Sequence, residues 1–261
     1  MYQQIEKIGA ATISVVEEFG RLLAFLFSTV KAIFSRPFGL NDLIRQLAFI
    51  GSYSVTIIIF SGLFTGMVLA LLFYNILSSY GSVDILGSAV AKSLLQELGP
   101  VMSALMVVAR VGSSTTAEIA IMRSEQQFDA LQCMAINPYR YVMVPKFIAA
   151  IISIPLLTAI FNVVGIFGGY LVGGLIKGIG GTVYLQNIID TVVWEDLRMS
   201  IVKSFIFALI IIWLALGKGF YVHLEKGVFG AEAVSRVTTN AVVASAIAIL
   251  FFDFIVNSFL I

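Results

Sequence analysis

The stretch that decides the fold runs from Leu47 to Leu77 and reads LAFIGSYSVTIIIFSGLFTGMVLALLFYNIL. It contains no Asp, Glu, Lys or Arg. A helix needs about 20 predominantly apolar residues to cross about 30 Å of hydrocarbon. This segment is long enough to do so, and it far exceeds the roughly 10 residues of a transmembrane β-strand. It therefore predicts a membrane-spanning α-helix.

The composition of the whole chain supports the same class. Of the 261 residues, 59% are hydrophobic and 12% are charged, whereas soluble domains carry about 25% charged residues. Disordered chains are poor in apolar residues, so disorder is excluded. The net charge of +1 argues against a nucleic-acid binder that relies on a basic surface. We expect an all-α integral membrane protein.

Four further apolar segments follow the first one. Three are single spans in length: Ile85–Ala109, Met199–Leu216 and Val237–Leu260. The fourth, Val142–Ile176, would measure about 52 Å as one helix, so it is either a hairpin of two short helices or one long tilted helix. No polar turn divides it, which favours the long helix, and Pro155 would kink that helix. The sequence thus predicts about five transmembrane helices.

The basic residues predict the orientation. Twelve of the 16 Lys and Arg residues lie before the first span, between the second and third, or between the fourth and fifth. Because basic residues concentrate in cytoplasmic loops, we expect a cytoplasmic N-terminus and a C-terminus on the opposite, periplasmic side.

The first 40 residues form a separate unit, an amphipathic helix that precedes the membrane-spanning region 41–261. Apolar residues recur there at helical spacing: Ile5, Ile8, Val15, Phe19, Leu22, Leu26, Val30 and Ile33. Such a stripe is typical of a helix that lies in the membrane interface. Burial of the stripe against the spans of the same chain is the alternative.

Several kinds of chemistry have no support in the sequence. There is no G-x-x-x-x-G-K-[ST] loop, so the chain does not hydrolyse ATP by that route. His223 is the only histidine and Cys133 the only cysteine, which argues against a His/Cys metal site or a Cys–His nucleophile. We therefore expect neither an enzyme nor a resident metal or cofactor.

One cytoplasmic segment, between the second and third spans, is unusually acidic. Glu118, Glu125 and Asp129 are spaced by seven and four residues, which would place them within about 40° of one another on a single helix. We predict such a helix over about 115–136, bounded by the Gly112-Ser113-Ser114 turn and by Asn137-Pro138. An acidic stripe gains nothing from an anionic lipid surface, so a protein partner is the better interpretation.

Three ionisable residues fall inside predicted spans: Glu97, Lys203 and Asp253. Charges in the membrane are costly and are functional candidates by default. Counting from the ends of the spans places all three in the outer half of the bilayer. We expect Lys203 to pair with Glu97 or with Asp253, unless it extends to the headgroups. Three roles stay open for the group: holding the bundle together, relaying protons or gating a cavity.

A longer set of motifs resembles the MlaE family. The residues concerned are Glu97-Leu98-Gly99-Pro100, Ala109-Arg110-Val111-Gly112-Ser113, Ala117-Glu118-Ile119, Met122-Arg123, Glu125-Gln126, Asp129-Ala130-Leu131 and Met134 to Pro138. Gly62 to Met67, Pro155-Leu156-Leu157, Gly168-Gly169 and the run from Gly230 to Thr239 also match. One departure is Gln96, where better-known members carry a basic residue.

The resemblance implies a permease subunit of an ABC transporter that moves glycerophospholipids between inner and outer membranes. It implies a homodimer in the bacterial inner membrane, an ABC ATPase dimer that binds ATP and magnesium, and a ring of MCE-domain subunits on the periplasmic side. The resemblance also implies a small cytoplasmic accessory subunit. The acidic helix would be the coupling helix, contacting the ATPase through Glu118, Arg123, Glu125, Gln126 and Asp129.

A lipid cavity is expected where the first two spans meet. The first span carries Leu69, Phe73, Ile76, Leu77 and Tyr80 at helical spacing, and Leu98 lies on the next span. An apolar stripe alone more often faces lipid or packs against a neighbouring helix than lines a pocket, and it is the resemblance that favours the cavity. Two alternatives of another class are a self-contained secondary transporter and a membrane scaffold that transports nothing. Five spans do not divide into the two halves of an inverted repeat.

Overall fold

The computed structural model describes residues 2–34, 39–224 and 230–260, and this part of the chain is helical without any strand. Five helical rods in it are long and apolar enough to cross a membrane: Leu40–Ser79, Val83–Ser124, Tyr139–Ile176, Trp194–Phe220 and Ala231–Phe259. The predicted all-α class and the predicted number of spans are confirmed.

Three of these rods contain short π-helical turns. The first comprises α2 (Leu40–Leu47) and α3 (Tyr53–Ser79). The second comprises α4 (Leu86–Ser93), α5 (Gly99–Val107) and α6 (Ser113–Ser124). The third is α8 (Val144–Tyr170) with a π-helical turn at each end. The fourth is α10 (Trp194–Phe220) and the fifth is α11 (Ala231–Leu260).

The third rod decides between the two arrangements left open by the sequence. Tyr139–Ile176 is one continuous helical rod of 38 residues with Pro155 inside it, so the hairpin is excluded. Small residues let the first rod pack closely against it. A Cβ added to Gly66 of α3 would lie 1.8 Å from the carbonyl oxygen of Gly165 in α8, so only glycine fits at this crossing.

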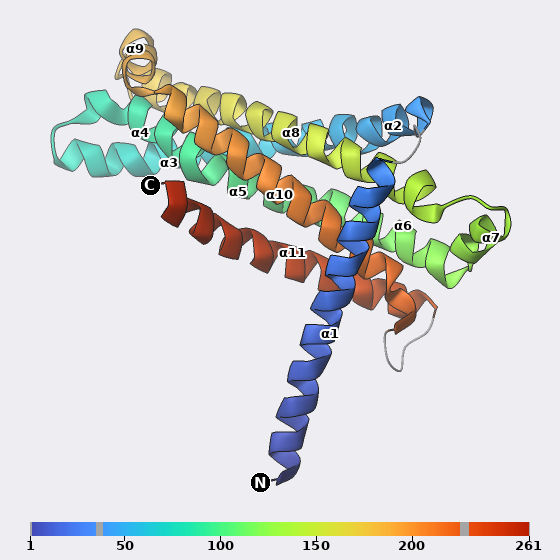
Figure 1. Ribbon diagram of the computed structural model, residues 1–261. Helices are drawn as coiled ribbons and strands as arrows, with labels where there is room; N and C mark the ends of the chain where they lie inside the picture. Colours follow the sequence, from blue (N-terminus) through green and yellow to red (C-terminus); the bar gives the residue numbers. More distant parts are fainter. Residues whose placement is uncertain (1, 35–38, 225–229, 261) are drawn as a thin grey trace.

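Helix α10 forms the centre of the bundle. In the most apolar 18-residue stretch of α10, two-thirds of the residues are buried, whereas the corresponding share is 22% in the first rod and 11% in α11. The outer faces of α3 and α11 are therefore left to lipid or to other chains. Figure 1 shows α10 lying between α8 and α11, with α5 beside it.

The two ends of the bundle differ in what they carry. Helix α9 (Gly181–Thr191) and the C-terminal end of α11 lie at one end, while α2, α6 and the short α7 (Gln127–Cys133) lie at the other (Figure 1). Helix α9 is anchored by Tyr184, whose side chain is fully buried. The orientation predicted from the basic residues would place the end with α6 and α7 on the cytoplasmic side.

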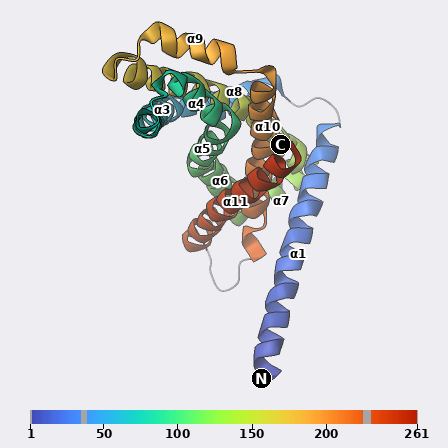
Figure 2. The ribbon, with the colours of Figure 1, turned by 90° about the vertical axis from the view of Figure 1, so that its left-hand side faces the viewer.

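The N-terminal helix α1 (Tyr2–Ile33) crosses the bundle and extends well beyond it (Figures 1 and 2). Its second half packs on α10: the Trp213 indole donates a hydrogen bond of 2.7 Å to the carbonyl of Leu22, and Lys218 pairs with Glu18. The buried face consists of Leu22, Phe25, Thr29 and Ala32.

This buried face differs from the predicted apolar stripe. Phe25 is buried although it is not a member of that stripe, whereas Phe19 is exposed although it is a member. Helix α1 crosses α10 at a steep angle, so the contact between them is limited to about three turns of α1. Phe25 lies where it packs against the aromatic rings at the end of α10. The side chains of Ile5, Ile8 and Val15 lie outside the described residues.

Candidate functional site

The three predicted intramembrane charges meet in one cluster. Lys203 Nζ lies 2.9 Å from Glu97 Oε2 and 3.0 Å from Asp253 Oδ1, and the Lys203 side chain is fully buried. Lys203 also donates a hydrogen bond of 2.7 Å to the carbonyl of Gln96. The cation thus joins three spans, and it contacts both acids rather than one of them. The side chain does not extend to the headgroups.

Two further polar residues, absent from the prediction, complete the cluster. Asn257 Nδ2 donates to Glu97 Oε2 at 3.1 Å. The Gln96 side chain donates to Asp196 Oδ1 at 2.5 Å, and Asp196 in turn accepts from the backbone N–H of Val193 at the start of α10. Gln96 therefore links the cluster to the end of α10 that lies beside α9, a role that helical spacing alone could not have revealed.

The predicted lipid-cavity residues lie on α3 and on the π-helical turn between α4 and α5. Leu69, Phe73, Leu77 and Leu98 are half-buried against the core, whereas Ile76 and Tyr80 are exposed. Leu98 follows Glu97 of the charged cluster directly in the sequence, and the α3 residues lie on an apolar surface. In the single chain the surface is open, and a closed cavity would need a second molecule to cover it.

The cytoplasmic acidic segment is not one helix. α6 continues the second rod without a turn at Gly112–Ser114, and it ends at Ser124. Gln126 then adopts a left-handed conformation with a φ of 58°, after which α7 begins, and Ala135 repeats that conformation. The predicted single stripe of Glu118, Glu125 and Asp129 is therefore wrong, because a residue with positive φ breaks the helix between them.

Glu118 belongs to a different contact from the other two acids. Its carboxylate lies 2.7 Å from Lys146 Nζ of α8, and the Lys146 side chain is 3% exposed against 46% for Glu118. Lys146 also lies 3.4 Å from the side-chain oxygen of Gln46 in α2. Glu118 thus helps to neutralise a buried lysine where the first three rods meet.

Arg123 holds the start of α7 against the bundle. Its Nη1 lies 3.0 Å from Asp129 Oδ1, and its Nε donates to His223 Nδ1 at 3.3 Å. The guanidinium carbon also lies 5.4 Å from the centre of the Phe220 ring, at the end of α10. Of the remaining predicted coupling residues, Glu125 is exposed and accepts from Gln127, and Gln126 occupies the bend.

Beneath Arg123 lies a cluster of aromatic rings. Phe128 of α7 is fully buried, with its ring centre 5.5 Å from that of Phe220. Phe220 also contacts Phe25 of α1 at 5.4 Å and Tyr139 at the start of the third rod at 5.5 Å. These four rings connect α7, α1 and two spans, so a displacement of α7 would act directly on α10.

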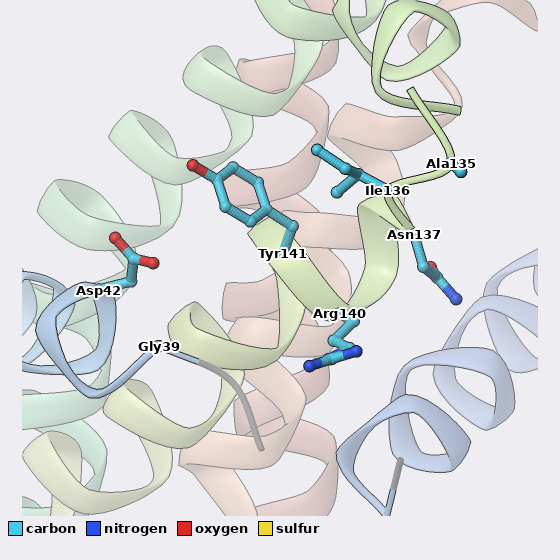
Figure 3. A pocket seen from close by; sticks show the side chains of 7 residues that line it. All are labelled: Gly39, Asp42, Ala135, Ile136, Asn137, Arg140 and Tyr141. Carbon is cyan, nitrogen blue, oxygen red and sulfur yellow. The ribbon is translucent and has the colours of Figure 1, made fainter. Parts of the chain in front are cut away.

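A hollow of about 360 Å³ lies next to this region, between α2 and the loop that follows α7. Figure 3 shows Asp42 on one side, Asn137 and Arg140 on the other, and the ring of Tyr141 between them. Its charged and polar lining is that of a surface that contacts water or a protein rather than lipid tails. Among the described residues, no group of three or more His, Cys, Asp or Glu side chains could hold a metal ion.

Comparison with known proteins decides the family. The model of the family described as Permease MlaE matches residues 43–259. The chain belongs to the MlaE permease family. It is 36% identical over 257 residues to the intermembrane phospholipid transport system permease protein MlaE of Haemophilus influenzae, covering 97% of this chain and 96% of that protein.

Other known proteins are similar to this chain over most of their length. A probable ABC transporter permease protein of Rickettsia felis is 37% identical over 96% of this chain and 95% of its own length. A probable ABC transporter permease protein of Synechocystis is 32% identical to this chain, covering 92% of this chain and 90% of its own length. The motifs from Glu97 to Pro138 that resemble the MlaE family extend in the structure from the Lys203 cluster through α5, α6 and α7. They therefore connect the membrane interior with the cytoplasmic end.

Proposed function

We propose that this chain is the permease subunit of an ABC transporter that moves glycerophospholipids between the inner and outer membranes of a bacterium. The observation that carries the proposal is full-length similarity to a permease named for intermembrane phospholipid transport. The five spans and the absence of a nucleotide-binding loop from the sequence agree with a membrane subunit that depends on a separate ATPase.

The lipid would be held between two copies of the chain, in a cavity lined by Leu69, Phe73, Ile76, Leu77, Tyr80 and Leu98. Two features support this placement. The outer face of α3 is largely uncovered in the single chain, and large uncovered apolar faces on a spanning helix suit lipid or a second subunit. The Lys203 cluster adjoins Leu98 and would supply the polar end of an otherwise apolar site.

The ATPase dimer would bind at the cytoplasmic end, where it holds ATP and magnesium itself. Exposed Glu125 and the hollow beside Asp42 offer polar contacts there. Phe128 and Arg123 would transmit the movement of α7 to α10. Glu118 would contribute indirectly, through Lys146, rather than by touching the ATPase.

The remaining parts of the proposal concern the surroundings. We assign the chain to the inner membrane with a cytoplasmic N-terminus and a periplasmic C-terminus. The MCE ring would then cover the end that carries α9, and a small accessory subunit would sit on the cytoplasmic side with the ATPase. The predominance of basic residues in segments on the α6 and α7 side supports this orientation.

Purification of the full-length chain from its own membranes tests the proposal against both alternatives. A transporter of this class retains an ATPase and bound phospholipid, which immunoblotting or proteomics and lipid mass spectrometry detect. A secondary transporter would transport without ATP, and a scaffold would bind proteins without moving lipid after reconstitution. ATP-independent lipid movement, or none in the presence of the copurified ATPase, would contradict the proposal.

Site-specific photo-crosslinking tests the cavity. A photoreactive residue at Leu77 or Tyr80 should capture phospholipid that survives extensive detergent washing. The same residue at Ile255 of α11 is the control and should label only loosely bound lipid. Equal labelling at the three positions would remove the assignment of the cavity while leaving the family membership intact.

A further inference from the structure

A second apolar hollow, of about 300 Å³, lies inside the membrane-spanning part and away from the α3 surface. It is bounded by Pro155 to Ile166 of α8, by Leu197 to Ser204 of α10, and by Ile188 and Val192 at the end of α9. The stretch of α8 along it extends for about 16 Å at 1.5 Å per residue. The hollow is therefore a narrow slot that runs from α9 toward the middle of the bilayer.

The lining determines what kind of ligand fits. None of the residues that line this hollow is charged, whereas the other two hollows described in the structure include Asp42 and Arg140 or Glu18 and Lys218. An uncharged, mostly aliphatic wall binds an uncharged, apolar group. The site therefore excludes a phosphate or any other headgroup from its interior.

The hydroxyl and amide groups in the wall bond within the protein. Thr158 donates to the carbonyl of Ile154 and lies 2.7 Å from the hydroxyl of Ser103, and Ser204 donates to the carbonyl of Ile201. Asn162 Nδ2 donates to Ser200, while its oxygen lies against Gly99 of α5 and accepts no hydrogen bond from the described residues. Apart from that oxygen, these groups are satisfied within the protein, and the small side chains leave space in the slot.

The mouth of the slot opens on the outside of the bundle. Val163 beside it is 68% exposed, and Leu197 and Ile201 are also exposed. In a bilayer this mouth faces acyl chains. A methylene occupies roughly the volume of a water molecule, about 30 Å³, so the slot has room for roughly ten methylenes. A whole helix, about 10 Å across, does not fit in it.

We propose that this slot binds one acyl chain of a membrane phospholipid, with the headgroup at the level of α9 and the chain extending toward Pro155. The lipid would come from the leaflet on the α9 side. The chain would pack on the helical turn that carries Lys203, since Ser200 and Ser204 flank that residue. This site is separate from the proposed transport cavity and does not depend on transport.

The test uses the full-length protein in nanodiscs that contain phosphatidylcholine with a diazirine halfway along one acyl chain. After irradiation, peptide mass spectrometry should place most of the label on residues 155–166 and 197–204. Phe205 and Leu209, exposed on the same helix but outside the slot, give the level of labelling by bulk lipid.

Two substitutions fill the slot from opposite walls, Ala159→Phe from α8 and Ile201→Trp from α10. Each should reduce labelling of the slot to the level of bulk lipid. Leu156→Phe is the matched control on the exposed side of α8 outside the slot, and it should leave the labelling unchanged. A normal elution volume and unchanged labelling at Leu209 verify that each variant is folded.

Three results would overturn the proposal: slot labelling no higher than at Leu209 in the parent, labelling that survives both filling variants, or protection of the slot by a copurifying protein. The last result would assign the slot to a side chain of a partner helix. Loss of lipid transport with slot labelling intact would count against the proposed function alone.

Discussion

In the Lys203 cluster and in the Arg123 cluster one basic side chain joins three elements, and these two clusters differ in their surroundings. Lys203 is fully buried between three spans and contacts two carboxylates. Arg123 is partly exposed at the cytoplasmic end and contacts one carboxylate, an imidazole and an aromatic ring. Lys203 itself is buried, while the Glu97 side chain is 39% exposed in the single chain. The Arg123 cluster lies at the surface beside the short helix α7.

The comparison assigns the two clusters different roles: one holds spans together, and the other can transmit movement. Removing one partner of a buried ion pair strongly destabilises the folded protein. An exposed ion pair contributes only about 0–1 kcal/mol to its stability. The Lys203 cluster is therefore suited to fixing the positions of spans two, four and five. The Arg123 cluster can yield at small cost, which suits a contact that has to change during a transport cycle.

The largest effect is expected from Lys203→Met. Removing the cation leaves Glu97 and Asp253 without their shared partner inside the bundle, so we expect a loss of about 3–5 kcal/mol of stability. Thermal unfolding in detergent, followed by size-exclusion chromatography, measures it. Lys177→Met is the matched control at the same end of the bundle, because Lys177 only lies over the Tyr74 ring at 4.8 Å. A Lys203→Met protein as stable as the control would mean that the cluster contributes nothing.

Charge swaps sharpen the same comparison. Lys203→Glu alone should impair function, because it places three acids together. Combining it with Glu97→Lys or with Asp253→Lys should each restore part of the activity, since Lys203 contacts both acids at about the same distance. Full rescue by one swap and none by the other would assign Lys203 to a single partner.

Much of the fold could be predicted because the lengths of the apolar segments determine the number of spans. The five spans follow from runs of apolar residues, and the unbroken third span follows from the absence of a polar turn between Val142 and Ile176. The break at Gln126 could not be predicted in this way. Gln and Ala rarely adopt a positive φ, so the residue types at Gln126 and Ala135 do not indicate the breaks that the structure has there.

The candidate site was predictable to the extent that isolated charges in a membrane require partners. That argument brought Lys203, Glu97 and Asp253 together. It could not find Gln96 or Asn257, because amides are tolerated in spans and carry no comparable cost when unpaired. Helical spacing wrongly grouped Glu118 with Glu125 and Asp129, because spacing does not reveal that Lys146 is buried beside Glu118.

The second largest effect is expected from Phe128→Ala in the aromatic cluster. Phe128 is fully buried, and deleting a buried phenyl ring costs about 3–5 kcal/mol. We expect the lower end of this range because the seven-residue α7 can move away from the bundle. Reconstituted complexes should still hydrolyse ATP but transport less lipid per ATP. Phe27→Ala, on the exposed side of α1, is the control, and equal transport by both variants would exclude the cluster from coupling.

A smaller effect is expected from Glu125→Lys, which changes only the exposed bend between α6 and α7. If Glu125 contacts the ATPase, reversing its charge should weaken binding by about 2 kcal/mol, or roughly thirtyfold. Pull-down of the ATPase measures this. Glu118→Gln is the comparison, because it retains an acceptor for Lys146 and should leave binding unchanged. Binding lost in Glu118→Gln but kept in Glu125→Lys would reverse the assignment of the two acids.

The smallest effect concerns His223, which faces Arg123, Asp129 and the end of α10. Burial and then the charge of Arg123 lower the pKa of His223 below 6.5, while the Phe220 backbone and Asp129 act in the opposite direction. A lowered pKa means that the folded protein binds the proton less well than the unfolded chain does, so stability present above pH 6.5 declines as the pH falls through the folded pKa. Protonation would also remove the acceptor for the Arg123 hydrogen bond. We expect a small drop in the melting temperature between pH 7.5 and 5.5 that is absent in His223→Gln, whose amide cannot titrate. An identical drop in both proteins would assign the pH dependence to other groups.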